Sequence, residues 1–154
     1  MCTSSSFSGG LAWFVVLLDV AGLFGFVTLG FSVYYWLLLS GCLFGGAGAV
    51  LVLNRCCCGT GKIFEVHSRF THSSILLGIG TVLQTVGPAL LLQEYTDAKD
   101  GVEDHLDGEL LAATDTIYAL FIGGHLLTAS FNFVLFGIVV WKWHTSAEYK
   151  QVLP

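Results

Sequence analysis

The sequence predicts an all-α integral membrane protein, a bundle of four membrane-spanning helices. Three observations support this fold class. Hydrophobic residues make up 55% of the 154-residue chain and charged residues only 11%, which leaves too few charges for the surface of a soluble domain. The mean hydropathy is high, at +0.77. The hydrophobic residues are also gathered in long runs that short charged segments separate.

The first apolar run is too long for one helix. Between Leu11 and Leu53 the one formally charged residue is Asp19, and as a single helix this run would measure about 65 Å, roughly twice the hydrocarbon thickness. We place a turn at Gly30–Ser32, before an aromatic cluster typical of the headgroup level. Each span must be helical, because backbone amides have no water to bond in lipid. The predicted spans are about 11–30, 33–53, 73–93 and 112–141.

Basic residues predict the orientation. Five of the six lie between the second and third spans or in the tail: Arg55, Lys62, Arg69, Lys142 and Lys150. By the positive-inside rule that side is the cytosol. We therefore expect a cytosolic N-terminus over 1–10, a cytosolic tail over 144–154 and an acidic outer loop over 94–111. The predicted location is the plasma membrane or the endosomal system.

Two short patterns on the cytosolic side suggest modification and sorting. Cys56, Cys57 and Cys58 follow the second span, and juxtamembrane cysteines are typical sites of S-palmitoylation; unmodified thiols are an equally weighted alternative. Tyr149 and Val152 have the spacing of a tyrosine-based sorting signal that clathrin adaptors bind. Such a four-residue pattern also arises often by chance.

We expect no metal, cofactor or catalytic site. Three adjacent cysteines without a second cysteine or histidine pair do not form a zinc cage. Haem ligation is not expected, because His125 has no histidine partner at matched depth. The expected partners are the lipid bilayer, other membrane proteins or a second copy of the chain, and a clathrin adaptor, but no nucleic acid.

One interpretation of the sequence is an internal repeat that relates the two halves of the chain. An offset of 65 residues aligns Asp19 in the first span with Gln84 in the third. An offset of 83 relates the second span to the fourth, aligning Tyr35 with Tyr118, Gly41 with Gly124, Gly45 with Thr128 and Ala49 with Asn132. Two such hairpins would have the same orientation in the membrane and would be related by an axis along the membrane normal. Chance is the equally weighted alternative for so short a match.

Small residues in the second and fourth spans predict close helix packing. Gly41, Gly45 and Ala49 recur every four residues, and Gly124 begins the corresponding series in the fourth span. Small side chains at this spacing let helix backbones approach each other. We therefore expect both faces to lie inside the bundle.

Polar residues predict a layer near the middle of the membrane. Its members are Asp19, Gln84, His125, Thr128 and Asn132. An ionisable group at this depth costs about 3 kcal/mol or more and faces a partner or a water-filled cavity, so Asp19 is the central residue. We favour interhelical hydrogen bonds that fix the register of the helices. The alternative is a proton- or cation-linked site.

Three short motifs resemble the transmembrane protein 238 family: Leu18–Gly22, Leu39–Gly41 and Gly61–Glu65. The likeness covers roughly residues 11–70. Members of that family have a single hairpin, so the second hairpin of this chain has no counterpart there. The resemblance implies a small multi-pass membrane protein and no defined biochemical activity.

The leading functional hypothesis is a non-enzymatic structural or accessory component that acts through intramembrane helix contacts. The alternative is a small proton- or cation-coupled transporter or channel subunit that uses Asp19. An intramembrane enzyme ranks third, because no nucleophile, metal cage or acid-base pair is evident in the sequence.

Overall fold

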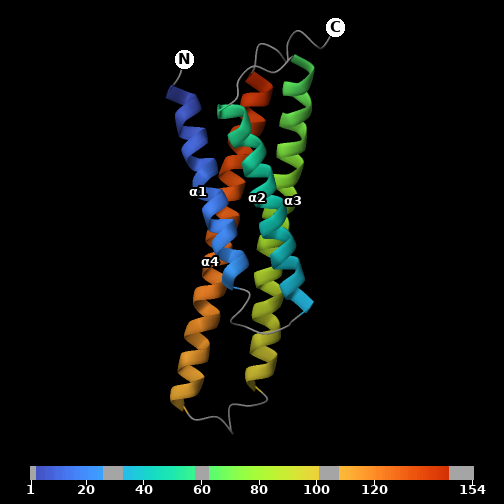
Figure 1. Cartoon of the computed structure of the whole chain (residues 1–154). Helices are drawn as coiled ribbons and strands as arrows, with labels where there is room; N and C mark the ends of the chain where they lie inside the picture. The colour runs from blue at the N-terminus through green and yellow to red at the C-terminus, as the bar shows by residue number, and fades with distance from the viewer. Residues whose placement is uncertain (1–2, 26–32, 58–62, 101–107, 146–154) are drawn as a thin grey trace.

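Four helices make up the part of the chain that the structure describes. The computed structural model describes residues 3–25, 33–57, 63–100 and 108–145, and these contain no strand. The helices are α1 (Thr3–Gly25), α2 (Val33–Cys57), α3 (Ile63–Asp100) and α4 (Gly108–Thr145), shown in Figure 1. The predicted all-α four-helix fold class is therefore confirmed.

Three of the helices are long and apolar enough to cross a membrane. These stretches are Tyr34–Leu53 in α2, Phe70–Lys99 in α3 and Gly108–Thr145 in α4, and they indicate an integral membrane protein. The apolar stretch of α1 is shorter and covers Phe7–Leu23, about 25 Å of helix. The first of the four predicted crossings therefore stays a prediction.

The helices run alternately up and down, each beside its neighbour in sequence. The bundle closes because α1 also contacts α4. The N-terminal end of α1 and the C-terminal end of α4 lie at the same end of the bundle (Figure 1). Of the four neighbouring pairs, α2 and α3 share the most extensive contact and α1 and α4 the least.

The hairpin of α3 and α4 is longer than the bundle core. Each of these helices has 38 residues, about 57 Å against a hydrocarbon thickness of about 30 Å. They extend past α1 and α2 at the end away from the N-terminus (Figure 1). The acidic outer loop predicted over 94–111 is wrong in its extent, because α3 continues to Asp100 and α4 starts at Gly108. Glu, Lys and Ala in this segment are good helix formers, so the helix continues past the apolar run.

Polar contacts join α3 to α4 near this protruding end. The rings of Tyr95 and Tyr118 stack with centroids 4.1 Å apart. The hydroxyl of Tyr95 donates a hydrogen bond to Asp115, and Lys99 Nζ lies 2.9 Å from Asp115 Oδ2. These contacts join α3 to α4 close to the end of α3 and the start of α4.

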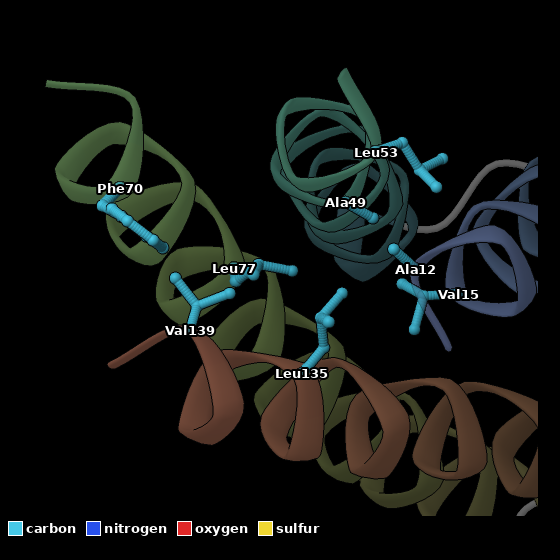
Figure 2. Packing of buried hydrophobic residues seen from close by; sticks show 8 residues of the cluster. All are labelled: Ala12, Val15, Ala49, Leu53, Phe70, Leu77, Leu135 and Val139. Carbon is cyan, nitrogen blue, oxygen red and sulfur yellow. The ribbon is translucent and has the colours of Figure 1, made fainter. Parts of the chain in front are cut away.

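All four helices contribute to the main apolar core, which lies towards the end of the bundle that contains the start of α1. Its buried residues are Ala12, Val15, Ala49, Leu53, Phe70, Leu77, Leu135 and Val139. Figure 2 shows these side chains in the space between the helices. Lipid is as apolar as the core, so packing contacts rather than escape from water stabilise this arrangement.

The outer surface of the bundle is also apolar. Large exposed hydrophobic side chains occur on every helix, among them Trp13, Leu17, Leu43, Val82, Leu120 and Phe133. A water-soluble protein does not expose hydrophobic side chains on this scale. The surface therefore fits contact with a lipid bilayer.

Candidate functional site

Close packing of α2 on α3 positions the polar centre of the bundle. A Cβ atom built on Gly80 of α3 would lie 2.6 Å from the backbone nitrogen of Gly45 in α2. One built on Gly41 would lie 2.8 Å from Cγ of Gln84. The absence of side chains at these glycines lets the two backbones touch, and this contact holds Gln84 at the centre of the bundle.

Three polar side chains from three helices meet at this centre. Asp19 of α1 is 1% exposed, and Gln84 of α3 and Asn132 of α4 are both 0% exposed. Gln84 Nε2 donates to Asp19 Oδ1 at 2.5 Å. Asn132 Nδ2 donates to Gln84 Oε1 at 2.9 Å and lies 3.5 Å from Asp19 Oδ1. The hydrogen bonds therefore form a closed triangle among α1, α3 and α4.

Two further residues lie against this triangle: Cys42, which adds the remaining helix α2, and His125 of α4. Gln84 Nε2 donates to the sulfur of Cys42 at 3.6 Å, and that sulfur lies 3.9 Å from His125 Nδ1. Both residues are buried. The ring of Phe121 packs edge-on against His125, with centroids 4.5 Å apart. We name Asp19, Cys42, Gln84, His125 and Asn132 the polar cluster; it contains residues of all four helices.

Four of the five residues of the predicted polar layer therefore come together, and Thr128 does not join them. Its hydroxyl donates to the backbone oxygen of Gly124 at 2.9 Å, so it satisfies the hydrogen bond within α4. Cys42 is a member that the sequence did not lead us to predict. Cys42 and His125 are 83 residues apart, the offset that aligns the second and fourth spans, and this spacing could have identified the cysteine.

Two contacts of the polar cluster join residues that the predicted repeat aligns; the repeat itself stays a prediction. Asp19 and Gln84, which the 65-residue offset aligns, are hydrogen-bonded to each other. Cys42 and His125, which the 83-residue offset aligns, are also in contact. A two-fold axis along the bundle brings equivalent residues together wherever they face it, so both contacts are expected of two parallel hairpins.

Two oxygen atoms of the polar cluster have no hydrogen-bond partner among the described residues. They are Asp19 Oδ2 and Asn132 Oδ1, and both are buried. Both face Gly45, since a Cβ built there would lie 3.0 Å from the first and 3.1 Å from the second. A carboxylate and an amide oxygen only accept hydrogen bonds, so a hydrogen on the Asp19 carboxyl would be needed to pair them with each other.

The predicted packing role of Gly124 is wrong. Gly41 and Gly45 lie close to atoms of other helices, but Gly124 does not. A Cβ built on Gly124 would meet no atom within 4 Å. The residue lines a groove of about 210 Å³ between α1 and α4, together with Gly22, Thr128 and His125. Ala49, the remaining member of the α2 series, is fully buried.

The structure does not bear on the predicted modification and sorting residues. Cys56 and Cys57 end α2, but their side chains are outside the described set. Cys58, Tyr149 and Val152 lie outside the described residues altogether. Within the described residues, no group of three or more His, Cys, Asp or Glu side chains is placed to hold a metal ion.

Fold and site together define a helical integral membrane protein with a buried polar centre. No family model matches the chain, and no curated protein or solved structure matches it either. The resemblance to the transmembrane protein 238 family therefore stays a prediction from short motifs.

Proposed function

We propose that the protein is a structural or accessory component of a membrane that acts through helix contacts. In this proposal the polar cluster fixes the register of the four helices. The observation that carries it is the closed triangle of Asp19, Gln84 and Asn132, in which each residue is hydrogen-bonded to both of the others. Interhelical hydrogen bonds in membranes contribute about 1 kcal/mol each, so the triangle stabilises one relative position of three helices.

The burial of the polar cluster supports this role. Asp19 is 1% exposed and makes its hydrogen bonds to protein groups. Its neighbours Gln84 and Asn132 are uncharged at every pH and neither gives up nor takes a proton. Such a set suits a fixed contact better than a conducting path.

Substitution of Asp19 tests the proposal. Asp19→Asn keeps a polar side chain of the same size, whereas Asp19→Leu leaves Gln84 and Asn132 without it. We expect Asp19→Leu to lower the thermal unfolding midpoint of the purified protein in detergent and Asp19→Asn to lower it less. Proteoliposomes of the wild type should show no pH-dependent flux of protons or small cations. Equal stability of all three proteins would contradict the proposed role.

A second candidate function is a small proton- or cation-coupled transporter or channel subunit that uses Asp19. The unpaired oxygens of Asp19 and Asn132 favour it, because buried polar atoms without partners are uncommon and often serve function. His125 is in contact with the same cluster through Cys42. Flux in wild-type proteoliposomes that Asp19→Asn abolishes, with an unchanged unfolding midpoint, would establish this alternative over the first.

We further propose that both termini face the cytosol, in the plasma membrane or the endosomal system. The concentration of basic residues on that side of the predicted topology supports this orientation. The test is a protease added to the cytosolic side of sealed vesicles. It should leave the acidic segment 101–107 intact, and cleavage there would reverse the orientation.

S-palmitoylation of Cys56, Cys57 and Cys58 and adaptor binding through Tyr149 and Val152 complete the proposal. Their support is the position of both segments next to predicted spans on the cytosolic side. Acyl exchange on the membrane-inserted protein should detect thioester-linked lipid that replacing the three cysteines by serine removes. Tyr149→Ala should raise the surface fraction of the protein, and an unchanged fraction would exclude the sorting signal.

A further inference from the structure

A second groove lies between α1 and α4, near the end of the bundle that contains the start of α1 and the end of α4. Its volume is about 530 Å³, and residues of both helices line it. Gly137 of α4 forms part of the wall, and a Cβ built there would meet no atom within 4 Å. The groove is therefore a shallow open space on the lipid-facing side of the bundle, separate from the polar cluster.

The polarity of this groove changes along its length. Val134, Gly137 and Ile138 line its deeper part, nearer the middle of α4. Lys142 and Thr145 line the part at the end of that helix, and Ser8 of α1 lies beside them. Between Val134 and Lys142 α4 rises about 12 Å. The groove therefore has an apolar part about 12 Å long and an end that carries a positive charge and hydroxyl groups.

Lys142 is held over the polar end of the groove. Its ammonium donates a hydrogen bond to Ser8 Oγ at 2.8 Å, which joins α4 to α1. Trp141 beside it is 71% exposed and lines the same groove. An exposed tryptophan next to a lysine at a helix end is typical of the level of lipid headgroups.

We propose that this groove binds one anionic phospholipid, with its phosphate at Lys142 and one acyl chain along Gly137. The order of polarity along the groove matches a lipid oriented like those of the surrounding bilayer. The positive charge at its polar end selects an anionic headgroup, as basic pockets between membrane helices do. A transmembrane helix of a second copy fits less well, because the groove ends in a cation and two hydroxyl groups rather than in small apolar residues.

Fluorescence of Trp141 provides a direct measurement. Replacing Trp13, Trp36 and Trp143 by phenylalanine leaves Trp141 as the single tryptophan. This protein in detergent is titrated with phosphatidylglycerol or phosphatidylcholine that carries bromine on the acyl chains. We expect half-maximal quenching at about fivefold less phosphatidylglycerol, the effect of one lysine near an anionic surface.

Two substitutions test the polar and apolar parts of the groove. Lys142→Gln should make the two lipids quench equally, whereas Lys99→Gln, at the opposite end of the bundle, should not change the preference. Gly137→Leu should fill the groove and reduce quenching by both lipids. Gly123→Leu is its matched control, because a Cβ there also meets no atom within 4 Å and the residue lines neither groove described above.

Several outcomes would overturn the proposal. Equal quenching by the two lipids in the parent protein would exclude an anionic preference, and persistence of the preference in Lys142→Gln would remove the lysine from the site. Displacement by glycerol phosphate would indicate a site for a soluble anion. A change in oligomeric state with Gly137→Leu would indicate a second copy as the occupant. Native mass spectrometry of the wild-type chain with each lipid repeats the comparison without the tryptophan replacements and supports the site if phosphatidylglycerol stays bound.

Discussion

The seam between α2 and α3 and the seam between α1 and α4 differ in how closely their helices pack. Along α2–α3, glycines of both helices contact the facing helix. A Cβ on Gly80 would lie only 2.6 Å from the backbone nitrogen of Gly45 in α2. Along α1–α4 there are two grooves. The two helices also contact each other through individual side chains, such as the edge-on rings of Phe14 and Phe131. Two parallel repeats would make these seams equivalent. The bundle therefore has one tightly closed seam and one that is partly open.

The sequence of α1 explains the difference. The offset that aligns Asp19 with Gln84 also aligns Val15 with Gly80. Val15 is fully buried and packs in the apolar core, whereas Gly80 leaves room for the backbone of α2. The β-branched side chain of Val15 keeps a neighbouring helix at a distance, whereas a glycine such as Gly80 lets the backbone of a neighbouring helix come close. This pair of residues is one difference between the two seams, and Gly45, which aligns with Thr128, is another.

Gly80→Val provides the largest test of this comparison, because it places the residue of the open seam into the closed one. Its Cβ would overlap backbone atoms of Gly45, which no rotamer change relieves. We expect a loss of about 3 kcal/mol or more in unfolding free energy, measured by unfolding in mixed detergent micelles. Gly124→Val, at the open seam, should change it by less than about 0.5 kcal/mol. Similar losses for both variants would refute the distinction between the seams.

Gln84→Leu should have the next largest effect. Gln84 bonds to Asp19, Asn132 and Cys42, and its loss leaves buried polar groups without partners. The expected destabilisation is about 2 kcal/mol, read from the same unfolding experiment. Gln93→Leu, at an exposed position of the same helix, is the control and should be neutral. An unchanged free energy for Gln84→Leu would show that the polar cluster does not hold the helices.

Phe14→Ala probes the bridge across the open seam. Phe14 packs edge-on against Phe131 with ring centroids 5.0 Å apart, and such aromatic pairs contribute about 1 kcal/mol. We expect a loss of this order and a wider separation of α1 from α4 in distance measurements between spin labels on the two helices. Labels on α2 and α3 should keep their separation, and a change there instead would place the weak seam elsewhere.

Tyr95→Phe should have the smallest effect on the bundle. It removes the hydrogen bond to Asp115 but keeps the stacking on Tyr118. Because these residues lie near the protruding end, we expect faster amide hydrogen exchange around Tyr95 with the global unfolding midpoint unchanged. A lowered midpoint would mean that this end is coupled to the rest of the bundle, and unchanged or slower exchange would mean that the hydrogen bond does not stabilise it.

The apolar runs by themselves determined the helical class and the three stretches that are long and apolar enough to cross a membrane. Backbone groups in lipid must be paired within a helix, so a long apolar run leaves little choice of structure. Residue spacing also brought most of the polar layer together, because Asp19 and Gln84 lie at matching depths in their helices. These properties belong to single segments and their lengths.

The tertiary structure alone decided which faces meet. Gly41 and Gly124 look alike in the sequence, but only the first has a facing helix close by. Cys42 likewise became part of the polar cluster because Gln84 and His125 lie against it. A helix needs only its own residues to form in lipid, whereas a close contact needs two complementary surfaces. The pattern of one helix therefore predicts its own structure but not which of its faces are covered.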